Sequence, residues 1–423
     1  MKELKNKNDL MEFWNGSFEN IDDTVSENVR KIISGVRKNN DKALFDLTEK
    51  YDGVRLHKLR VDPAKIVEAF ESFDSELKRA FEQAAFNIRE FHSGQLPGSW
   101  SIGNQEKIYL GQKYSPIESV GIYVPGGKAV YPSTLLMNCI PAQVAGVERI
   151  VIVSPPGKDG KISSVILACA GLLGIDEVYS IGGAQSIAAL AYGTESIDPV
   201  VKITGPGNKY VNEAKLQVFG KVGIDMPAGP TELIIAADSS SRADYIAWDL
   251  TAQAEHDPDA KTLLITDSME LAENVRKRLG EIADKTERTD IVKASLLNNS
   301  GLYLVADISE SVEYINDLAP EHLEIMTEKP FELSKKIRNA GAIFVGEYTP
   351  NAVGDYWAGP NHTLPTSGAA KFSSPLNVLD FMKFSSVIGY SKKSLREVSG
   401  SINKMAQSEK LFAHGRSVEV RNE

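Results

Sequence analysis

Apolar residues in the first part of the chain recur at intervals of three and four positions, as in Val25, Val29, Ile32, Ile33 and Val36. Residues at this spacing share one face of a helix. The pattern therefore predicts helical structure over residues 9–92. This region contains no motif of a binding or catalytic site, and we expect it to act as scaffold.

From residue 120 the pattern changes to short apolar runs, each followed by a turn rich in Gly and Pro and then by a helical stretch. Such runs occur at 120–124, 150–153, 178–181 and 200–203, and a second block has them at 233–236, 262–265, 302–305 and 342–345. Continuous apolar runs are typical of parallel strands buried on both faces. Alternation of strands and helices predicts an α/β fold with two parallel sheets. The chain then ends in two predicted helices, about 394–399 and 402–413, with Gly415 as a stop signal.

The turns that follow the first four strands are candidates for a nucleotide site, because ligands bind outside the carboxyl ends of strands in such sheets. None of them contains the full Gly-x-Gly-x-x-Gly fingerprint. Gly182 and Gly183 precede a helix predicted over 186–192, where free N–H groups would suit a pyrophosphate. A tight strand-to-helix turn explains the same glycines equally well.

Composition narrows the class of protein. The 423 residues carry a net charge of −10 with a pI near 5.3, which disfavours nucleic acid and anionic membranes as partners. No apolar run reaches the about 20 residues of a membrane-spanning helix, and the N-terminus lacks an apolar signal core, so we expect a cytoplasmic protein. Cys139 and Cys169 stand in apolar surroundings and are expected to be buried and inert.

Gln253 and His256 lie one turn apart at the end of a predicted helix that Pro258 prevents from continuing. At about 100° per residue both side chains can converge on one point, which is a spacing that metal ligands use. Taken alone, the pair is more typical of a polar helix end with a surface histidine. The other histidines decide between these interpretations.

Four of the six histidines, His256, His322, His362 and His414, fall in the last 170 residues. Glu321 adjoins His322 and suits an acid/base pair, although a surface loop is the alternative. Asp355 and His362 belong to a loop rich in functional side chains, and Glu409 precedes His414 near a helix end. The remaining histidines, His57 and His92, stand among charged residues and are expected at the solvated surface.

Together these segments resemble the histidinol dehydrogenase family, from about residue 114 to 420. The resemblance rests on the order of the motifs at 123–127, 182–185, 205–208, 225–230, 253–256, 319–322, 354–356 and 361–366. It implies the oxidation of L-histidinol to L-histidine with two NAD in histidine biosynthesis. Residues 1–113 share only their helical character with the family.

The resemblance also implies roles for single residues. One Zn²⁺ per subunit would be held by Gln253, His256, Asp355 and His414, a donor set that suits this ion. Glu321 and His322 would be the acid/base pair. Substrate contacts would come from Thr231, Gln253, His256, His322, Asp355, His362, Glu409 and His414, and NAD contacts from Tyr123, Gln185 and Asn208. Where many members of the family carry Ser, this chain has Thr231, which keeps the hydroxyl group.

The resemblance further implies a homodimer with shared active sites, because His414 and Glu409 are expected to come from the partner subunit. We expect two incomplete Rossmann-like domains. The predicted division is an N-terminal helical arm at 1–20, a first domain from 21–122 and 238–372, a second domain at 123–237, and a C-terminal helical segment at 373–423.

Three other functions remain open at this level. A paralogue on the same scaffold would oxidise a sulfonated diol and would need a cation near the substrate loop, where Lys371 stands. A zinc hydrolase would use Glu321 as the base for water. A non-catalytic metal-binding scaffold is the third, and the Glu321–His322 pair disfavours it. An aldehyde oxidation through a thiohemiacetal is disfavoured because neither cysteine has activating neighbours.

Overall fold

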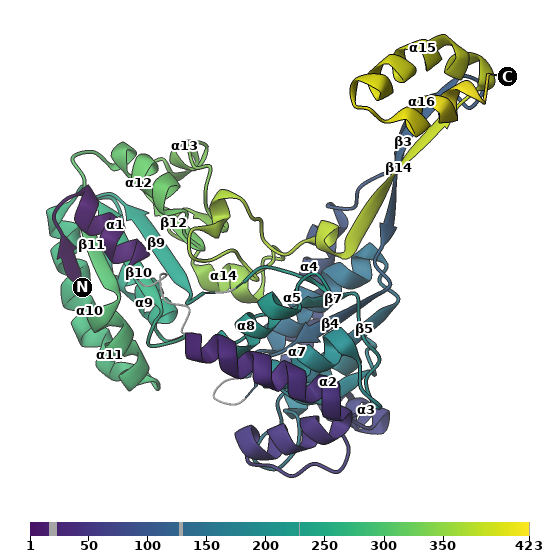
Figure 1. Cartoon of the computed structure of the whole chain (residues 1–423). Helices are drawn as coiled ribbons and strands as arrows, with labels where there is room; N and C mark the ends of the chain where they lie inside the picture. The colour runs from purple at the N-terminus through teal and green to yellow at the C-terminus, as the bar shows by residue number, and fades with distance from the viewer. Residues whose placement is uncertain (17–22, 127–129, 228, 423) are drawn as a thin grey trace.

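The computed structural model describes residues 1–16, 23–126, 130–227 and 229–422. Two α/β bodies lie beside each other, and a thin ribbon carries the C-terminal helices away from both (Figure 1). Over the described residues, the chain has no helix with the length and apolar character needed to cross a membrane.

One body is built on a five-stranded sheet in which all neighbouring strands are parallel. Its order is β6 (Val178–Ser180), β5 (Arg149–Ser154), β4 (Ser119–Tyr123), β7 (Lys202–Thr204) and β8 (Gly223–Ile224). The four predicted strands are confirmed. The sequence pattern missed β8, because two residues are too few to form an apolar run.

The other body holds a six-stranded parallel sheet. Its order is β1 (Lys2–Leu4), β11 (Ser300–Leu304), β10 (Lys261–Thr266), β9 (Glu232–Ala237), β12 (His322–Met326) and β13 (Ala342–Val345). Strand β12 escaped prediction because His322 and Glu324 interrupt its apolar run. Strand β1 is also new, so the described part of the predicted helical arm at 1–20 is a strand followed by helix α1 (Lys7–Asn15).

The early helices cover the five-stranded sheet. Helix α2 (Asp23–Asp52) packs on α7 (Gly183–Tyr192) and α8 (Lys209–Val218), α3 (Pro63–Glu71) on α6 (Ser164–Leu172), and α4 (Ser75–Ser93) on α5 (Pro132–Ala145). Val29 and Val36 are buried in one core with Val151 and Ile187. This packing differs from the predicted grouping of 21–122 with 238–372, since an apolar helix face does not specify which sheet it will cover.

Several histidine and cysteine side chains of this body are buried, which affects their hydrogen bonding or their pKa. His92 is buried, not at the surface as expected, and its Nδ1 lies 2.8 Å from the Ile88 carbonyl oxygen. Cys139 and Cys169 are buried as predicted. Burial raises the pKa of the Cys169 thiol to about 12 and that of Cys139 well above its usual range, so neither thiol forms a thiolate near neutral pH.

Over the described residues, the body with the six-stranded sheet also contains six α-helices after α1. They are α9 (Ala243–Ala254), α10 (Met269–Ile282), α11 (Thr289–Asn298), α12 (Ser311–Leu318), α13 (Pro330–Ser334) and α14 (Asn351–Tyr356). Helix α9 follows β9 and runs back along the sheet, so its last turn reaches the edge where the strands begin. Gln253 in that turn is thereby brought beside the amino ends of β9 and β12.

The arm is a three-stranded antiparallel ribbon of β14 (Met382–Tyr390), β3 (Ile108–Pro116) and β2 (Trp100–Gly103), followed by α15 (Lys392–Ser408) and α16 (Phe412–Glu419). Both C-terminal helices are present, with different bounds from those predicted. Gly415 does not stop a helix: it lies inside α16, where a Cβ atom would come 2.2 Å from Asn403 Oδ1. It therefore permits close packing of α16 on α15.

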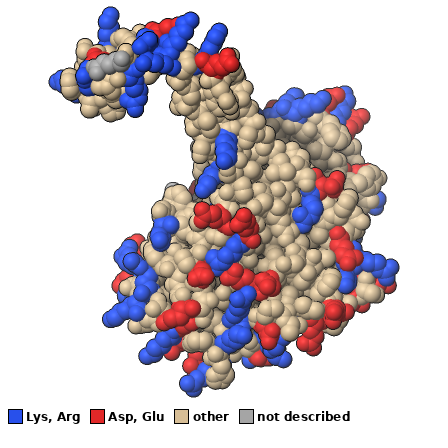
Figure 2. All heavy atoms as spheres, turned by 90° about the vertical axis from the view of Figure 1, so that its right-hand side faces the viewer, with Lys and Arg blue, Asp and Glu red and all other residues tan. Residues whose placement is uncertain are grey.

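The arm leaves large apolar side chains in solvent, including Ile388 at 70% exposure and Phe412 at 79%. Basic side chains gather on it (Figure 2), among them the exposed Lys383, Lys392, Lys393 and Lys404. The arm therefore presents an exposed surface that is both apolar and basic, on a chain whose net charge is −10.

Candidate active site

Glu321 and His322 stand where β12 begins, beside the start of β9. The parallel register pairs His322 with Leu233, so Thr231 and Glu232 lie next to Glu321 although about ninety residues separate them. Glu321 Oε2 accepts a hydrogen bond of 2.5 Å from the Thr231 hydroxyl and one of 2.8 Å from the Glu232 N–H. The carboxylate is buried and held in one orientation.

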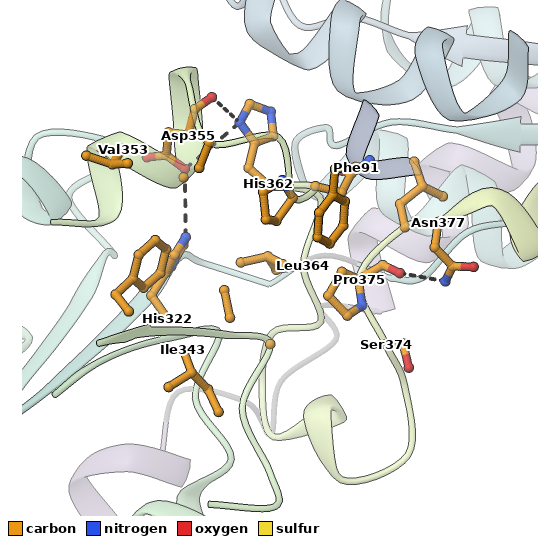
Figure 3. A pocket seen from close by; sticks show the side chains of 18 of the residues that line it. Phe91, His322, Ile343, Val353, Asp355, His362, Leu364, Ser374, Pro375 and Asn377 are labelled. Carbon is orange, nitrogen blue, oxygen red and sulfur yellow. Dashed lines mark hydrogen bonds and ion pairs between the residues drawn. The ribbon is translucent and has the colours of Figure 1, made fainter. Parts of the chain in front are cut away.

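Glu232 and Glu321 orient the imidazole of His322. Its Nδ1 lies 2.9 Å from the Glu232 carbonyl oxygen and 3.4 Å from Glu321 Oε2. Since Nδ1 donates to these oxygens, Nε2 is left to face the cavity, where it lies 4.0 Å from Asp355 Oδ1 (Figure 3). The arrangement presents one imidazole nitrogen to a ligand and anchors the other.

Electrostatics makes Glu321 and His322 an ion pair. Burial lowers the pKa of His322, but the carboxylates of Glu321 and Asp355 outweigh burial and raise this pKa to about 9. Burial raises the pKa of Glu321, but His322 and the hydrogen bonds from Thr231 and Glu232 outweigh it and bring it below its usual value. Near neutral pH the imidazole is a cation, and it must lose a proton before it can act as a base.

Gln253 joins the site through both ends of its amide. Its Nε2 donates to Thr231 Oγ1 over 2.5 Å, and its Oε1 accepts from Asn351 Nδ2 over 2.8 Å. The backbone N–H of Asn351 donates to Glu324 Oε1, also over 2.8 Å. These bonds fix the direction of the Gln253 carbonyl group and tie the start of α14, which carries Asp355, to β12.

A cavity of about 720 Å³ opens beside His322, Asp355 and His362, with Phe91, Phe344 and Leu364 in its wall (Figure 3). His362 Nδ1 lies 3.0 Å from the Asp355 carbonyl oxygen, and its Nε2 lies 3.4 Å from Thr134 Oγ1. Burial lowers the pKa of His362, so this imidazole is neutral near pH 7. The cavity combines an apolar wall with a few convergent polar groups, as small-molecule sites do.

The other predicted metal and substrate residues lie in two separate parts of the structure. His256, just beyond α9, is partly exposed. Glu409 and His414 are exposed on the tip of the arm, which stands away from both bodies (Figure 1). Within the described ranges, no three His, Cys, Asp or Glu side chains come together in a way that would hold a metal ion. One chain therefore brings together Gln253 and Asp355 near His322, but not His414.

The predicted nucleotide turns gather at the carboxyl ends of β4, β6 and β7. Tyr123 ends β4, and its hydroxyl oxygen accepts from the Gly183 N–H over 3.4 Å. Burial raises the pKa of Tyr123 to about 12, which keeps the phenol neutral. Gln185 is buried in the first turn of α7, and Asn208 caps α8 by accepting from the N–H groups of Tyr210 and Val211.

The contacts of both glycines agree with the interpretation as a tight strand-to-helix turn. A Cβ atom on Gly182 would come 2.5 Å from Pro155 Cβ, so close packing alone requires glycine there. Gly183 is the first residue of α7, which begins three residues before the predicted start. Its N–H donates to the Tyr123 hydroxyl oxygen rather than pointing to open solvent.

Sequence reasoning missed Glu232, Asn351 and Glu324, and all three are buried. Glu232 contacts Glu321 and Asn351 contacts Gln253, whereas Glu324 contacts Asn351. A signal existed for Glu324, since it stands two residues after His322 and so shares its face of a strand. Asn351 and Glu232 carried no comparable signal, because their contacts depend on the packing of α14 and β9.

The fold and the site define an α/β protein with a buried Glu321–His322 pair at a cavity and glycine-containing turns on the neighbouring sheet. The family model described as Histidinol dehydrogenase matches residues 17–422. The chain belongs to the histidinol dehydrogenase family.

Individual relatives agree with this assignment. Histidinol dehydrogenase of Bacillus licheniformis is 51% identical over 394 residues, which cover 93% of this chain and 92% of the relative. That of Bacillus subtilis is 50% identical over 393 residues, with 93% and 92% covered. The crystal structure of histidinol dehydrogenase from Elizabethkingia anophelis superposes with a TM-score of 0.94 at 35% identity, covering 100% of this chain and 98% of that one.

Proposed function

We propose that this chain oxidises L-histidinol to L-histidine through L-histidinal at one site, with two NAD and one Zn²⁺ per subunit. Family membership makes it an NAD-dependent oxidoreductase of the final steps of histidine biosynthesis. The observation that carries the proposal is the anchored His322 imidazole, whose Nε2 faces the cavity beside Asp355.

The cavity favours a cationic or neutral substrate over a sulfonated diol. The described residues that line it include no Lys or Arg, and the side chain of Lys371 is exposed. Asp355 supplies a carboxylate suited to an amine, and the apolar wall suits an imidazole ring. Thr231, His362 and Glu409 are proposed as further substrate contacts.

Three residues of one chain fit a zinc ion, provided that a second chain supplies the fourth ligand. Gln253 presents an oriented carbonyl oxygen, Asp355 a carboxylate and His256 an imidazole, all of which are ligands that zinc accepts. We assign His414 of a second copy as the fourth. Bound zinc would hold the imidazole and amino nitrogens of the substrate and so orient its carbinol group.

The chain's own residues would then move the protons. Neutral His322 would accept the hydroxyl proton at Nε2 as the carbinol hydrogen leaves as hydride to NAD, which gives the aldehyde. Glu321 would next accept a proton from water as the water adds to the aldehyde carbon, and His322 would return its proton from Nε2 to the carbonyl oxygen, which gives the hydrate. The hydrate would lose a second hydride to a second NAD, and His322, neutral again, would take the hydroxyl proton. Tyr123, Gln185 and Asn208 are proposed to hold NAD.

The arm is the basis for proposing a homodimer with shared sites. It carries Glu409 and His414 on an exposed apolar and basic surface, whereas the site that needs them lies in the body. A second copy, with net charge −10, has the opposite charge to this surface. We propose the cytoplasm as its location.

The function is tested by supplying L-histidinol, NAD and zinc and counting products. We expect about two NADH for each histidine, because two hydrides leave the same carbon. A ratio near one would contradict the four-electron scheme. Product formation with no NADH absorbance would instead favour the hydrolase.

Replacing His256 with Ala is expected to lower the zinc affinity of the dimer by about tenfold or more, because an imidazole ligand is lost. Metal analysis after dialysis against a chelator measures the effect. His57→Ala, which removes an exposed histidine outside the site, is the matched control and should retain its zinc. Full zinc content in His256→Ala would overturn the ligand assignment.

A further inference from the structure

Lys215 and Asp225 form an ion pair that the proposed mechanism does not use, and both side chains are only 1% exposed. Burying two charges costs more than burying a neutral pair of the same shape. A pair that served only to fill space would therefore be better replaced by apolar side chains. Its contacts indicate what else it does.

Lys215 Nζ meets three oxygen atoms, one for each of its protons. It contacts the Asp225 carboxylate, the Gly205 carbonyl oxygen at 3.1 Å and the Met226 carbonyl oxygen at 3.2 Å. Asp225 Oδ2 in turn accepts from the Gly205 N–H over 2.8 Å. Both polar groups of the Gly205 backbone are thus bound to this pair.

Gly205 opens the turn that carries Asn208. Its φ of +113° favours glycine, and a Cβ atom would come 2.1 Å from the Tyr123 carbonyl oxygen. The turn therefore lies directly against the end of β4, where Tyr123 stands. Any shift of Gly205 would move the turn relative to Tyr123, and Asn208 follows three residues later.

Asp225 and Met226 open a second segment, which follows β8 and leads to Thr231. The far end of this segment is held by the bond from the Gly229 N–H to Thr366 Oγ1, at 2.6 Å, and Thr231 donates to Glu321. The buried pair thus joins the turn before α8 to the segment that reaches the acid/base residues.

We propose that Lys215 and Asp225 are positioning residues for NAD, which hold the 205–208 turn in register with the segment that ends at Thr231. The inference rests on the proposed NAD site. Neither residue is assigned a contact with NAD, so their effect passes through Gly205 and Asn208.

The test compares Lys215→Met, Asp225→Asn and the double variant, using the NAD dissociation constant, the KM for NAD, zinc content and thermal unfolding. Removing one partner leaves a buried charge without its counterion and lowers the melting temperature. The double variant removes both charges and is expected to regain thermal stability. It should still bind NAD about tenfold more weakly than the wild type, because the Gly205 and Met226 carbonyl groups have lost their donor. It should keep its zinc.

Glu177→Gln is the matched control. Arg149 and Glu177 form an ion pair in the same sheet, with contacts of 2.7 and 2.9 Å, but at the opposite edge, where β5 and β6 begin. Its loss should lower the melting temperature and leave the NAD dissociation constant unchanged.

Asn208→Ala separates the two proposals. Normal NAD binding by Asn208→Ala would show that NAD does not use this turn. Weak binding by Asn208→Ala together with normal binding by the double variant would overturn the positioning role alone. The positioning role would also be refuted if the NAD affinity of the double variant recovered in step with its stability.

Discussion

Replacing His322 with Asn is expected to lower turnover by about 10²- to 10⁴-fold, the range that general acid/base groups contribute. The amide keeps the size and polarity of the side chain but cannot accept the hydroxyl proton. Zinc should stay bound, because His322 is not among the proposed ligands. Steady-state rates over a full pH range and metal analysis of the same sample measure both effects.

The pH profile gives this prediction a second measurement. Because the carboxylates of Glu321 and Asp355 raise the pKa of His322 to about 9, the neutral imidazole becomes more abundant as the pH rises from 7 towards 9. The wild-type rate should rise over this interval and the His322→Asn rate should not. His57→Asn is the control and should retain the wild-type profile. Normal turnover by His322→Asn at every pH would refute the assignment.

A mixed dimer of two variant chains, each of them inactive as a homodimer, is expected to regain activity. His414→Ala leaves a complete body and a defective arm, whereas His322→Asn leaves a defective body and a complete arm. If each site combines one body with the partner's arm, a mixed dimer has one complete site and about half of the wild-type activity. Coexpression with two affinity tags, purification of the mixed dimer and rate measurement test this.

The control pairs two defects in the same part of the chain. A mixed dimer of His322→Asn and His256→Ala has two defective bodies, so both of its sites should be inactive. Activity in His414→Ala homodimers, or none in the first mixed dimer, would show that the arm does not complete the partner's site. Size measurement of each sample must show a dimer for the comparison to hold.

Local patterns predicted most of the two sheets. Strands such as β5 and β10 are buried on both faces, and only an unbroken apolar run suits that position. Where a strand also serves the site, the run is broken: His322 and Glu324 stand in β12 because they contact Asp355 and Asn351. The polar residues that β12 contributes to the site are the same residues that interrupt its apolar run, so the apolar pattern did not predict this strand.

The sequence by itself determined the α/β class, the inert cysteines, the helix end that presents Gln253, and the adjacency of Glu321 and His322. All of these depend on spacing along a few residues, which chain geometry converts directly into position. The order of motifs added the family and the roles that the family implies.

Only the tertiary structure decided which sheet α2 to α4 cover, that His92 is buried, and that Thr231, Gln253 and Glu321 share hydrogen bonds. It also placed His414 on an arm away from the body and joined Lys215 to Asp225 in the core. These relations arise from strand register and helix packing between distant segments. Charged side chains in such places look like surface residues until the surrounding chain is in position.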